Sequence, residues 1–426
     1  MRKLVILGSG FGGYHAARRL ENSLSGRRRV QLTVVTDRAH FLFSPLLYSV
    51  ATGELDIPHV AIDLVNEYSP ETELIIDRVE AIDLDRRVLV CAERGELEFD
   101  YLLLATGSVV NFGAHPHWRE HVLTFKDSRD ALALREHVQQ RLDESPAVSG
   151  DPEALKCRLK IVIIGAGATG VELAAELSSA VRERLPDLDD EAARSFELVL
   201  IEAQDRILPR HGEEVQSVAK RQLADLGIKV HLDERVVDVG EGRVELTSGE
   251  VIEAETIIYC GGVRAPDLLS EAGFDTDELG RVQVDATLQV KGHRGIYAVG
   301  DGSVLDEPLP MEGDVARQQA ELAAQNLLAE LSGRMRREFS FEPTGDLITL
   351  GRDNAALSLR GVALEGKAAW LMYRLFYTAM MPRALKKARL LKGWVAKRAK
   401  KNGRRSDPPL LEGAPPMTSF PPVEES

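Results

Sequence analysis

The sequence predicts an α/β fold built from two Rossmann-like domains, and three observations indicate it. A β-run, a glycine-rich turn and a helical pattern follow one another in KLVILGSGFGGYHAARRL and again in KIVIIGAGATGVELAAEL. Each copy continues into a strand that ends at an acidic residue, and then into short alternating strands. The two copies are also nearly equal in length, one running from Gly8 to Gly107 and the other from Gly165 to Gly262.

The glycine-rich turns come first in each copy and share the spacing GxGxxG, with Gly8, Gly10, Gly13, Gly165, Gly167 and Gly170. In this motif the first glycine permits a tight turn, the second lets the backbone approach a pyrophosphate, and the third allows close helix–strand packing. A single motif could be a structural turn. Two of them, each between a strand and a helix, predict two bound dinucleotides, such as FAD and a nicotinamide nucleotide.

The strand after each turn ends at an acid, Asp37 in VQLTVVTD and Glu202 in FELVLIE. An acid at this place accepts hydrogen bonds from an adenosine ribose, and Glu202 would repel a 2′-phosphate, so NADH is favoured over NADPH. Both acids lie farther from the first glycine than the usual ~20 residues. In the second copy, RERLPDLDDEAARSF explains the excess as a helix extension and a loop.

Composition excludes several classes of protein. The chain has 426 residues, 44% of them hydrophobic and 28% charged, as in a globular protein of two or three domains. No apolar run reaches the roughly 18–20 residues that span a bilayer, and a strand starts too early for a signal or transit peptide. The histidines show no metal-binding spacing, so we expect no metal site.

The three cysteines, Cys91, Cys157 and Cys260, are far apart, and no CxxxxC occurs. This spacing argues against a disulfide scaffold and against disulfide-reductase chemistry. Cys260 follows a strand and could lie near a cofactor. A buried Cys that acts as a small hydrophobic residue is the favoured alternative.

The whole layout resembles the type II NADH dehydrogenases, which are single-chain NADH:quinone oxidoreductases. Three segments carry the resemblance: FLFSPLLYSVATGEL (41–55), GAGATGVELAAEL (165–177) and GIYAVGD (295–301). The resemblance covers about residues 3–335. It implies that the first fingerprint holds FAD, that the second holds NADH, and that a quinone is the electron acceptor.

The resemblance and the motifs together predict the cofactor contacts. FAD is expected at Gly8, Gly10, Gly13, Asp37, Pro45, Thr106, Gly107, Asp301 and Ala316. NADH is expected at Gly165, Gly167, Gly170, Glu202 and Gly262. The resemblance also implies that Glu172 lies near the nicotinamide and flavin rings and points away from the phosphates. The alternative is a carboxylate in the first turn of its helix, stabilised by the helix dipole.

The segment that the resemblance places beside the quinone departs from the family's sequence pattern. After the GIYAVGD strand the family reads similarly to Ala-Gln-x-Ala-x-Gln-Gln, whereas residues 313–319 read GDVARQQ. Gln318 matches, but Asp314 replaces the Gln expected to hydrogen-bond the quinone, which puts the acceptor in question. Asp314 either stabilises the start of its helix, or sits in a dry pocket with a raised pKa and relays protons with Glu172. The predicted catalytic residues are Glu172, Asp314 and Gln318.

Charge is uneven along the chain. The net charge is −14, which argues against nucleic-acid binding, yet residues 383–405 hold eleven cations and no carboxylate. Before them, residues 368–381 are apolar except for Arg374 and Thr378. This run is too short to span a bilayer but long enough for an amphipathic helix in its interface. Five aromatic residues suit the headgroup level: Trp370, Tyr373, Phe376, Tyr377 and Trp394.

The predicted anionic partner of residues 368–405 is therefore a membrane surface. The alternative is a core helix or a dimer-interface helix, which makes a homodimer possible. The tail, residues 402–426, contains six prolines and is expected to be disordered. The predicted organisation is an FAD-binding domain in two parts (1–115 and 266–335), an NADH-binding domain (116–265), a membrane-associating region (336–401) and the tail.

The predicted function is a flavoenzyme that passes hydride from NADH to FAD and two electrons to a membrane quinone, without pumping protons. By the resemblance it is cytoplasmic and peripheral on the inner face of the cell membrane. One alternative is a soluble NAD(P)H-dependent flavin reductase acting on a protein partner such as a ferredoxin. Another is a non-catalytic, redox-sensing flavoprotein.

Overall fold

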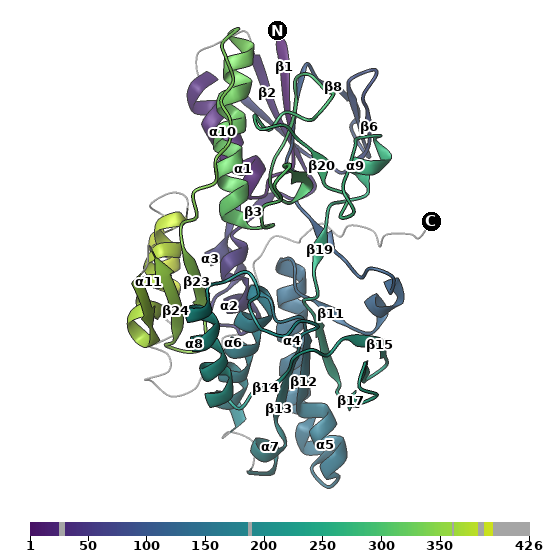
Figure 1. Cartoon of the computed structure of the whole chain (residues 1–426), viewed down its shortest axis with the longest axis vertical. Coiled ribbons are helices and arrows are strands. Elements are labelled where there is room, and N and C mark those ends of the chain that lie inside the picture. Colours follow the sequence, from purple (N-terminus) through teal and green to yellow (C-terminus); the bar gives the residue numbers. More distant parts are fainter. Residues whose placement is uncertain (25–29, 186–189, 360–361, 382–386, 395–426) are drawn as a thin grey trace.

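The structure is a computed structural model that describes residues 1–24, 30–185, 190–359, 362–381 and 387–394. It confirms the predicted α/β fold. Two five-stranded parallel sheets with helices packed on them form the two halves of the molecule. A small antiparallel sheet and a helix from the C-terminal part of the chain lie along one side (Figure 1).

The first parallel sheet contains the first glycine motif and has the strand order β21-β9-β1-β2-β5. Its strands are β1 (Arg2–Leu7), β2 (Val30–Thr36), β5 (Thr72–Ile76), β9 (Tyr101–Leu104) and β21 (Ile296–Ala298). The strands are apolar and buried along most of their length, as expected for a parallel sheet covered on both faces. Helices α1 (Phe11–Leu24) and α10 (Gly313–Leu331) pack together on one side of it, and an antiparallel sheet, β6 (Val79–Asp83), β7 (Val88–Cys91) and β8 (Gly95–Glu98), lies on the other (Figure 1).

The second parallel sheet repeats this plan in the order β11-β18-β12-β13-β14. Its strands are β11 (Leu123–Thr124), β12 (Lys160–Ile164), β13 (Glu197–Ile201), β14 (Lys229–His231) and β18 (Thr256–Tyr259). Its helices are α4 (Ser128–Glu144), α5 (Pro152–Leu159), α6 (Ala168–Arg184) and α8 (Glu213–Asp225). Its antiparallel sheet is β15 (Val236–Gly240), β16 (Arg243–Leu246) and β17 (Val251–Glu253). The predicted duplication is confirmed for the four strands β9-β1-β2-β5, which correspond to β18-β12-β13-β14, whereas the edge strands β21 and β11 come from outside the two copies.

The chain crosses between the two halves just after the closing glycines, Gly107 and Gly262. There β10 (Val109–Val110) pairs antiparallel with β19 (Val263–Arg264). The segment between β2 and β5 holds β3 (His40–Leu42), η1 (Ser44–Leu46), α2 (Leu47–Ala51), α3 (Ile57–Val60) and β4 (Ala61–Asp63). The other short elements are η2 (Pro116–Glu120), η3 (Ser145–Val148), α7 (Asp190–Ser195), α9 (Leu268–Glu271), β20 (Val282–Gln283), η5 (Gly300–Gly302) and β22 (Ser303–Val304).

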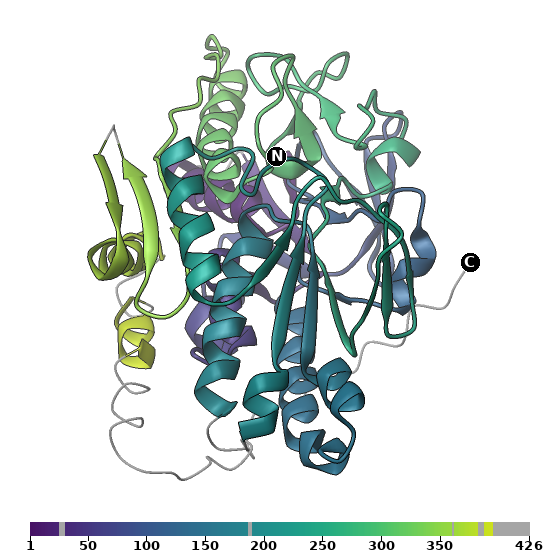
Figure 2. The same cartoon turned by 60° about the horizontal axis from the view of Figure 1, so that its bottom comes forward.

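The C-terminal part of the described chain forms a sheet that the sequence analysis did not predict. It consists of β23 (Asp346–Thr349), β24 (Ala355–Leu359) and β25 (Val362–Glu365), followed by helix α11 (Gly366–Met380). The sheet lies beside α8 and α6, and α11 packs on β24 (Figure 2). Buried side chains of β23, β24 and α11 belong to the same hydrophobic cluster as those of α6 and α8. This segment is therefore part of the main core.

The predicted helix in residues 368–381 is confirmed as α11, but its most exposed side chains are not the aromatic ones. Trp370 and Tyr373 of α11 are buried against the protein, as is Trp394 farther along the chain. The most exposed apolar side chains of α11 are Leu371 at 54% and Leu375 at 55% exposure. Amphipathic composition alone could not tell which face of the helix the protein covers. Within the described part of the chain, none of the helices has the length and apolar character needed to cross a bilayer.

Most of the basic run lies outside the described residues, as does the whole of the tail, 402–426. The described part, residues 387–394, is helical and contains Lys387, Arg389 and Lys392.

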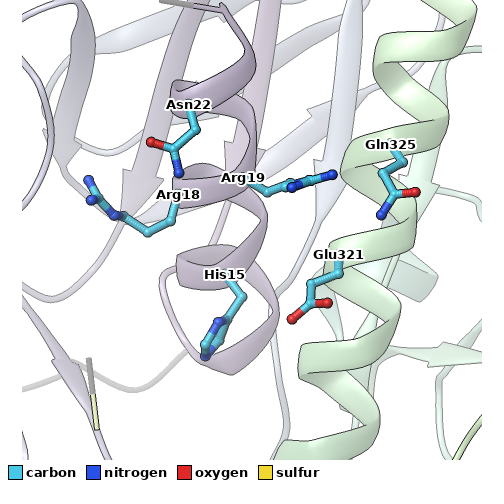
Figure 3. Close-up of a pocket in the computed structure, with 6 residues that line it drawn as sticks. All are labelled: His15, Arg18, Arg19, Asn22, Glu321 and Gln325. Atoms are coloured by element: carbon cyan, nitrogen blue, oxygen red, sulfur yellow. The ribbon is translucent and has the colours of Figure 1, made fainter. Parts of the chain in front are cut away.

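A polar cavity of about 380 Å³ lies between α1 and α10 (Figure 3). It is lined by His15, Arg18, Arg19, Asn22, Glu321 and Gln325. Arg18 is already paired with Glu21 at 2.7 Å. Burial lowers the pKa of His15 to about 4, so its ring is neutral. These residues form a polar seam between two helices that the sequence analysis did not single out.

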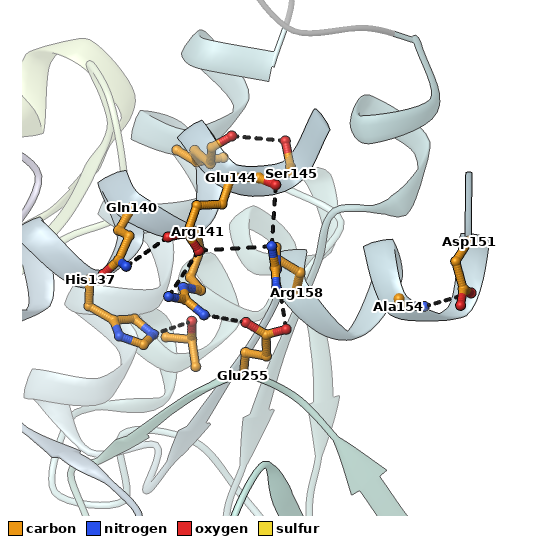
Figure 4. Close-up of polar contacts among 11 residues, drawn as sticks. His137, Gln140, Arg141, Glu144, Ser145, Asp151, Ala154, Arg158 and Glu255 are labelled. Atoms are coloured by element: carbon orange, nitrogen blue, oxygen red, sulfur yellow. Dashed lines mark hydrogen bonds and ion pairs between the residues drawn. The ribbon is translucent and has the colours of Figure 1, made fainter. Parts of the chain in front are cut away.

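A charged network ties α4 and α5 to the second sheet (Figure 4). Glu255, which precedes β18, accepts from the Arg141 guanidinium at 2.5 Å and from that of Arg158 at 3.2 Å. Arg158 also donates to the backbone carbonyl of Glu144 at 3.2 Å. The carboxylate of Glu255 thus joins two helices to one strand, in a place where neither arginine is more than 21% exposed.

The network predicts a stability effect for Glu255→Gln. The variant keeps the shape but removes the charge that two arginines share, so we expect it to lose about 1 kcal/mol of stability. Thermal unfolding should start at a temperature lower by about 2 °C. Glu253→Gln, an exposed change on β17, is the matched control. Equal unfolding midpoints for the two variants would contradict the structural role of Glu255.

Candidate functional site

The first glycine turn, between β1 and α1, has the close contacts that a pyrophosphate-binding turn needs. Gly8 has φ of +104°, and a Cβ built there would lie 2.2 Å from the carbonyl oxygen of Ala105. A Cβ on Gly13 would lie 1.8 Å from the carbonyl oxygen of Gly8. A Cβ on Gly10 would have nothing within 4 Å. Two positions are therefore closed by backbone contacts, and the one between them faces open space at the start of a helix.

The second turn, between β12 and α6, repeats this geometry. Gly165 has φ of +103°, and a Cβ there would lie 2.6 Å from the carbonyl oxygen of Cys260. A Cβ on Gly170 would lie 1.9 Å from the carbonyl oxygen of Gly165, whereas one on Gly167 would have nothing within 4 Å. The same three roles thus fall on the same three positions in both copies.

The residues predicted to hold FAD gather at the carboxyl ends of neighbouring strands in the first sheet. Thr106 follows β9, and its hydroxyl is buried without a hydrogen-bond partner among the described residues. Asp301 follows β21 and accepts from the Ser108 hydroxyl at 2.5 Å, with the Lys126 ammonium 3.7 Å away. Asp37 follows β2 and is exposed. An unpaired buried hydroxyl between two glycine-lined strand ends fits a polar cofactor.

Two further predicted FAD contacts lie at the ends of other elements. Ala316, on α10, lies against Gly300, where an added Cβ would be 3.1 Å from the Ala316 methyl group. Pro45, in η1, has a carbonyl oxygen that accepts from the Tyr373 hydroxyl at 3.4 Å. Helix α10 begins at Gly313, and its N-terminal turn lies next to the Phe11 ring at the start of α1.

A cavity of about 640 Å³ opens beside the second turn. Four of the five residues predicted to bind NADH line it: Gly165, Gly167, Glu202 and Gly262. The fifth, Gly170, packs under the turn. Arg210 and Arg235 also line the cavity, and sequence reasoning missed both because no spacing motif marks them. Their positive charge suits the phosphates of a dinucleotide.

Glu202 lies at the predicted place, at the end of β13, and is 8% exposed. Its carboxylate accepts from the backbone N–H groups of Ala166 at 2.8 Å and Gln204 at 3.0 Å. These bonds hold a negative charge at the rim of the glycine turn. The arrangement suits the recognition of ribose hydroxyl groups and opposes an added phosphate.

Glu172 lies where the two halves and the C-terminal segment meet. The sequence analysis placed Glu172 in the first turn of its helix. It is instead the fifth residue of α6 and so lies just beyond that turn. Its carboxyl accepts from the Thr349 N–H at 3.2 Å and from the Tyr373 hydroxyl at 3.3 Å. The side chain is thus directed at β23 and α11, as expected for one that avoids the phosphates. Burial raises the pKa of Glu172 to about 8.

The observed contacts of Asp314 match one of its two predicted environments and differ from the other. It is the second residue of α10 and forms an ion pair with Arg317 at 2.7 Å, with both side chains partly exposed, which differs from the alternative of a dry pocket. Its carboxylate also accepts from the Thr344 hydroxyl at 2.5 Å and from the Gln318 amide at 3.0 Å. These contacts agree with the alternative interpretation, a carboxylate that stabilises the start of its own helix.

Gln318 links the backbone of Glu342 to α10 through two hydrogen bonds. Its amide nitrogen donates to the carbonyl of Glu342 at 2.8 Å, and its amide oxygen accepts from the Glu342 N–H at 3.1 Å. The neighbouring Gln319, which is buried, accepts from the Gly300 N–H at 2.6 Å. Both glutamines therefore have partners within the protein.

The cysteines and the side chains that can bind metal ions were also located in the structure. All three cysteines are free. Burial raises the pKa of the Cys260 thiol to about 12, and its Cβ packs 3.6 Å from an ideal Cβ on Gly170. Cys260 also lines the cavity beside the second turn, so both predicted interpretations, a packing residue and a residue near a cofactor, remain compatible with its place. No group of His, Cys, Asp and Glu in the described ranges is arranged to hold a metal ion.

Two glycine turns of one design on two parallel sheets of one strand order define an oxidoreductase of the kind that binds two dinucleotides. A family model described as pyridine nucleotide-disulphide oxidoreductase matches residues 2–320. The chain belongs to this family. It lacks the paired cysteines that give the family part of its name.

Characterised relatives cover almost the whole chain. The chain is 29% identical over 413 residues to the type II NADH:quinone oxidoreductase Ndh of Mycobacterium tuberculosis, covering 92% of this chain and 87% of that one. It is 29% identical over 394 residues to the demethylphylloquinone reductase NdbB of Synechocystis, covering 89% and 92%. The structure of NDH2 from Plasmodium falciparum in complex with NADH has the same fold, with a TM-score of 0.86 and 16% identity over 93% of this chain and 98% of that one.

The two kinds of glycine predict opposite outcomes for alanine substitutions in the first turn. Gly13→Ala places a methyl group against a carbonyl oxygen, so we expect a loss of more than about 3 kcal/mol of stability. Gly10→Ala has room in the protein and should keep the unfolding midpoint of the protein without cofactor. Its methyl group faces the open space, so we expect that variant to lose bound FAD instead. Absorption at the flavin band and thermal unfolding would separate the two effects, and an FAD content of Gly10→Ala equal to that of the wild type would contradict the assignment.

Proposed function

We propose that this chain is an FAD-dependent NADH:quinone oxidoreductase that takes hydride from NADH and passes two electrons to a membrane quinone without pumping protons. The names of its characterised relatives support both the nucleotide and the acceptor. The single structural observation that carries the proposal is Glu172. This half-buried carboxyl accepts from the Tyr373 hydroxyl of α11, the helix with an apolar outer face. The same hydroxyl lies 3.4 Å from the carbonyl oxygen of Pro45, which is predicted to contact FAD.

FAD supplies the hydride and electron transfer chemistry, and the residues of the chain bind, orient and supply a proton. The first glycine turn, with Thr106 and Asp301, would hold the FAD. The second turn and Glu202 would hold NADH. Glu172 would keep a proton near neutral pH because burial raises its pKa to about 8, which suits a reaction that converts a quinone into a quinol.

The membrane contact is assigned to the outer face of α11. Leu371, Met372 and Leu375 are exposed there in a row of helical spacing, while the opposite face is buried on the protein. Arg389 and Lys392, in the described part of the basic run, add exposed positive charge that suits anionic lipid. This assignment makes the chain a peripheral membrane protein, and the resemblance to the type II NADH dehydrogenases favours the cytoplasmic face of the cell membrane.

Stopped-flow spectroscopy tests the function directly. The oxidised flavin band should bleach on mixing with NADH and return on mixing with a short-chain quinone. A flavin that NADH reduces but that no quinone reoxidises would overturn the proposal. In that case, reoxidation by a ferredoxin would support the alternative of a soluble reductase.

Glu202→Gln tests nucleotide choice. The variant keeps an acceptor for the Ala166 N–H but removes the negative charge, so the ratio of kcat/KM for NADH to that for NADPH should fall about tenfold, or about 1.4 kcal/mol. Glu250→Gln, an exposed acid outside the cavity, should leave the ratio unchanged. Should Glu202→Gln also leave it unchanged, Glu202 does not select the nucleotide.

Leu371→Ser combined with Leu375→Ser tests the membrane contact without removing the buried face of α11. Losing two aliphatic side chains of the size of leucine should lower partition onto anionic vesicles about 100-fold. NADH:ferricyanide activity should remain, because this acceptor is dissolved in water. The control pair, Leu132→Ser and Val251→Ser, removes exposed apolar area elsewhere. Equal vesicle flotation of the two double variants would count against the assignment.

A further inference from the structure

A lysine from the half that is proposed to bind NADH reaches an acid that is predicted to contact FAD. Lys126 lies between β11 and α4 of that half, whereas Ser108 comes after β9 and Asp301 after β21, both in the other half. The Lys126 ammonium donates to the Ser108 hydroxyl at 2.6 Å, and this hydroxyl donates to Oδ2 of Asp301 at 2.5 Å. Residues from three separate stretches of the chain thus form one continuous row of hydrogen bonds.

The ammonium group fixes the direction of this row. An ammonium can only donate hydrogen bonds, so Ser108 accepts from Lys126, and its single proton is left for the Asp301 carboxylate. Charged groups at both ends make such bonds stronger than bonds between neutral groups. The ammonium also lies 3.7 Å from the same carboxylate oxygen, and the two side chains are only 37% and 17% exposed. Without Lys126 the Ser108 hydroxyl is free to rotate, and Asp301 loses a fixed donor.

The half that carries Lys126 holds it in place. The carboxylate of Asp130, in the first turn of α4, accepts from the Lys126 backbone N–H at 2.7 Å. The next residue, Asp127, makes a second contact between the halves, because its carboxylate pairs with Arg38 at 3.2 Å. Arg38 directly follows Asp37, the other acid predicted to contact FAD. One short segment therefore reaches both acidic positions of the predicted FAD site.

The row leaves one oxygen of Asp301 for a ligand. Both described contacts of its carboxylate use Oδ2, so Oδ1 can accept a further hydrogen bond. The unpartnered hydroxyl of Thr106 is close by, since a Cβ on Gly302 would lie 2.8 Å from it. A carboxylate repels phosphate groups and accepts from hydroxyl groups. FAD has hydroxyl groups on the ribityl chain that joins its phosphates to the flavin ring.

We propose that Lys126 positions Asp301, through the Ser108 hydroxyl, to accept a hydrogen bond from the ribityl chain of FAD. The inference rests on the proposed function, because FAD is the cofactor of that function. It names a residue of one half that helps to hold the cofactor of the other. Lys126 touches no reacting atom and acts only through Ser108 and Asp301. Its charge also offsets the repulsion between the Asp301 carboxylate and the phosphates of the cofactor.

Lys126→Met tests the proposal, because it keeps most of the length of the side chain but removes the donor and the charge. The quantity measured is the rate at which the diluted holoenzyme releases FAD, followed by the rise in flavin fluorescence. We expect release to be about tenfold faster, as for the loss of one hydrogen bond to a charged group. Lys126→Arg keeps a charged donor and should release FAD at close to the wild-type rate. The matched control is Lys291→Met, because the Lys291 side chain is also 37% exposed and pairs with Asp306 at the surface.

Ser108→Ala tests the route, and it replaces Lys126→Met if that variant does not fold. It should release FAD as fast as Lys126→Met does. The double variant should be no faster than either single variant, because both changes interrupt the same row. Equal release rates for Lys126→Met and Lys291→Met would overturn the proposal, as would single effects that multiply to about 100-fold in the double variant. The proposed function would survive either result, because it fails only if NADH does not reduce the wild-type flavin or quinone does not reoxidise it.

Discussion

Backbone contact between a helix start and the strand before it is the constraint on which both halves depend. At Gly13 and at Gly170 the space beside the backbone is already filled by a carbonyl oxygen of the same turn, less than 2 Å from where a Cβ would be. Only a helix that starts this close to its strand presents its N–H groups to a phosphate at the strand's carboxyl end. The parallel order of each sheet then brings the ends of the neighbouring strands, with Thr106 and Asp301 in one half and Glu202 in the other, to the same edge.

This constraint also explains which parts of the fold the sequence could predict. A glycine turn between a strand and a helix is local, so its spacing, its acid at the next strand end and its repetition are all visible in the chain. The strands β23 to β25 are short and pair only with one another, and no sequence motif of the kind that marks the glycine turns predicts them. The face of α11 was misjudged for a related reason. Trp370 and Trp394 are buried around Arg374, and a run of aromatic and basic residues suits a membrane surface and a cation held between rings equally well.

In the candidate site, too, only the residues that belong to a local sequence pattern could be predicted. Glu172 could be found because it follows a glycine motif, and Glu202 because it ends a strand. Of the two surroundings predicted for Asp314, the contacts with Arg317 and Gln318 match the start-of-helix alternative, and the sequence alone could not choose between the two. Thr349 and Tyr373 come from segments more than a hundred residues away from Glu172, and no spacing connects them to it. Lys126 belongs to no motif, and only its contact with Ser108 distinguishes it from an ordinary surface lysine.

The position of the C-terminal sheet and α11 has a consequence for how such enzymes diverge. The strands and the glycine turns of the two nucleotide-binding halves are formed by residues outside this segment. The segment adds the residues that cover Glu172 and, on its other side, the apolar surface. Under the proposed function, a change confined to it would leave the residues that hold NADH unaltered and change the surroundings of the acceptor. In this architecture the choice of oxidant can evolve separately from the choice of reductant, because the two are encoded in different stretches of one gene.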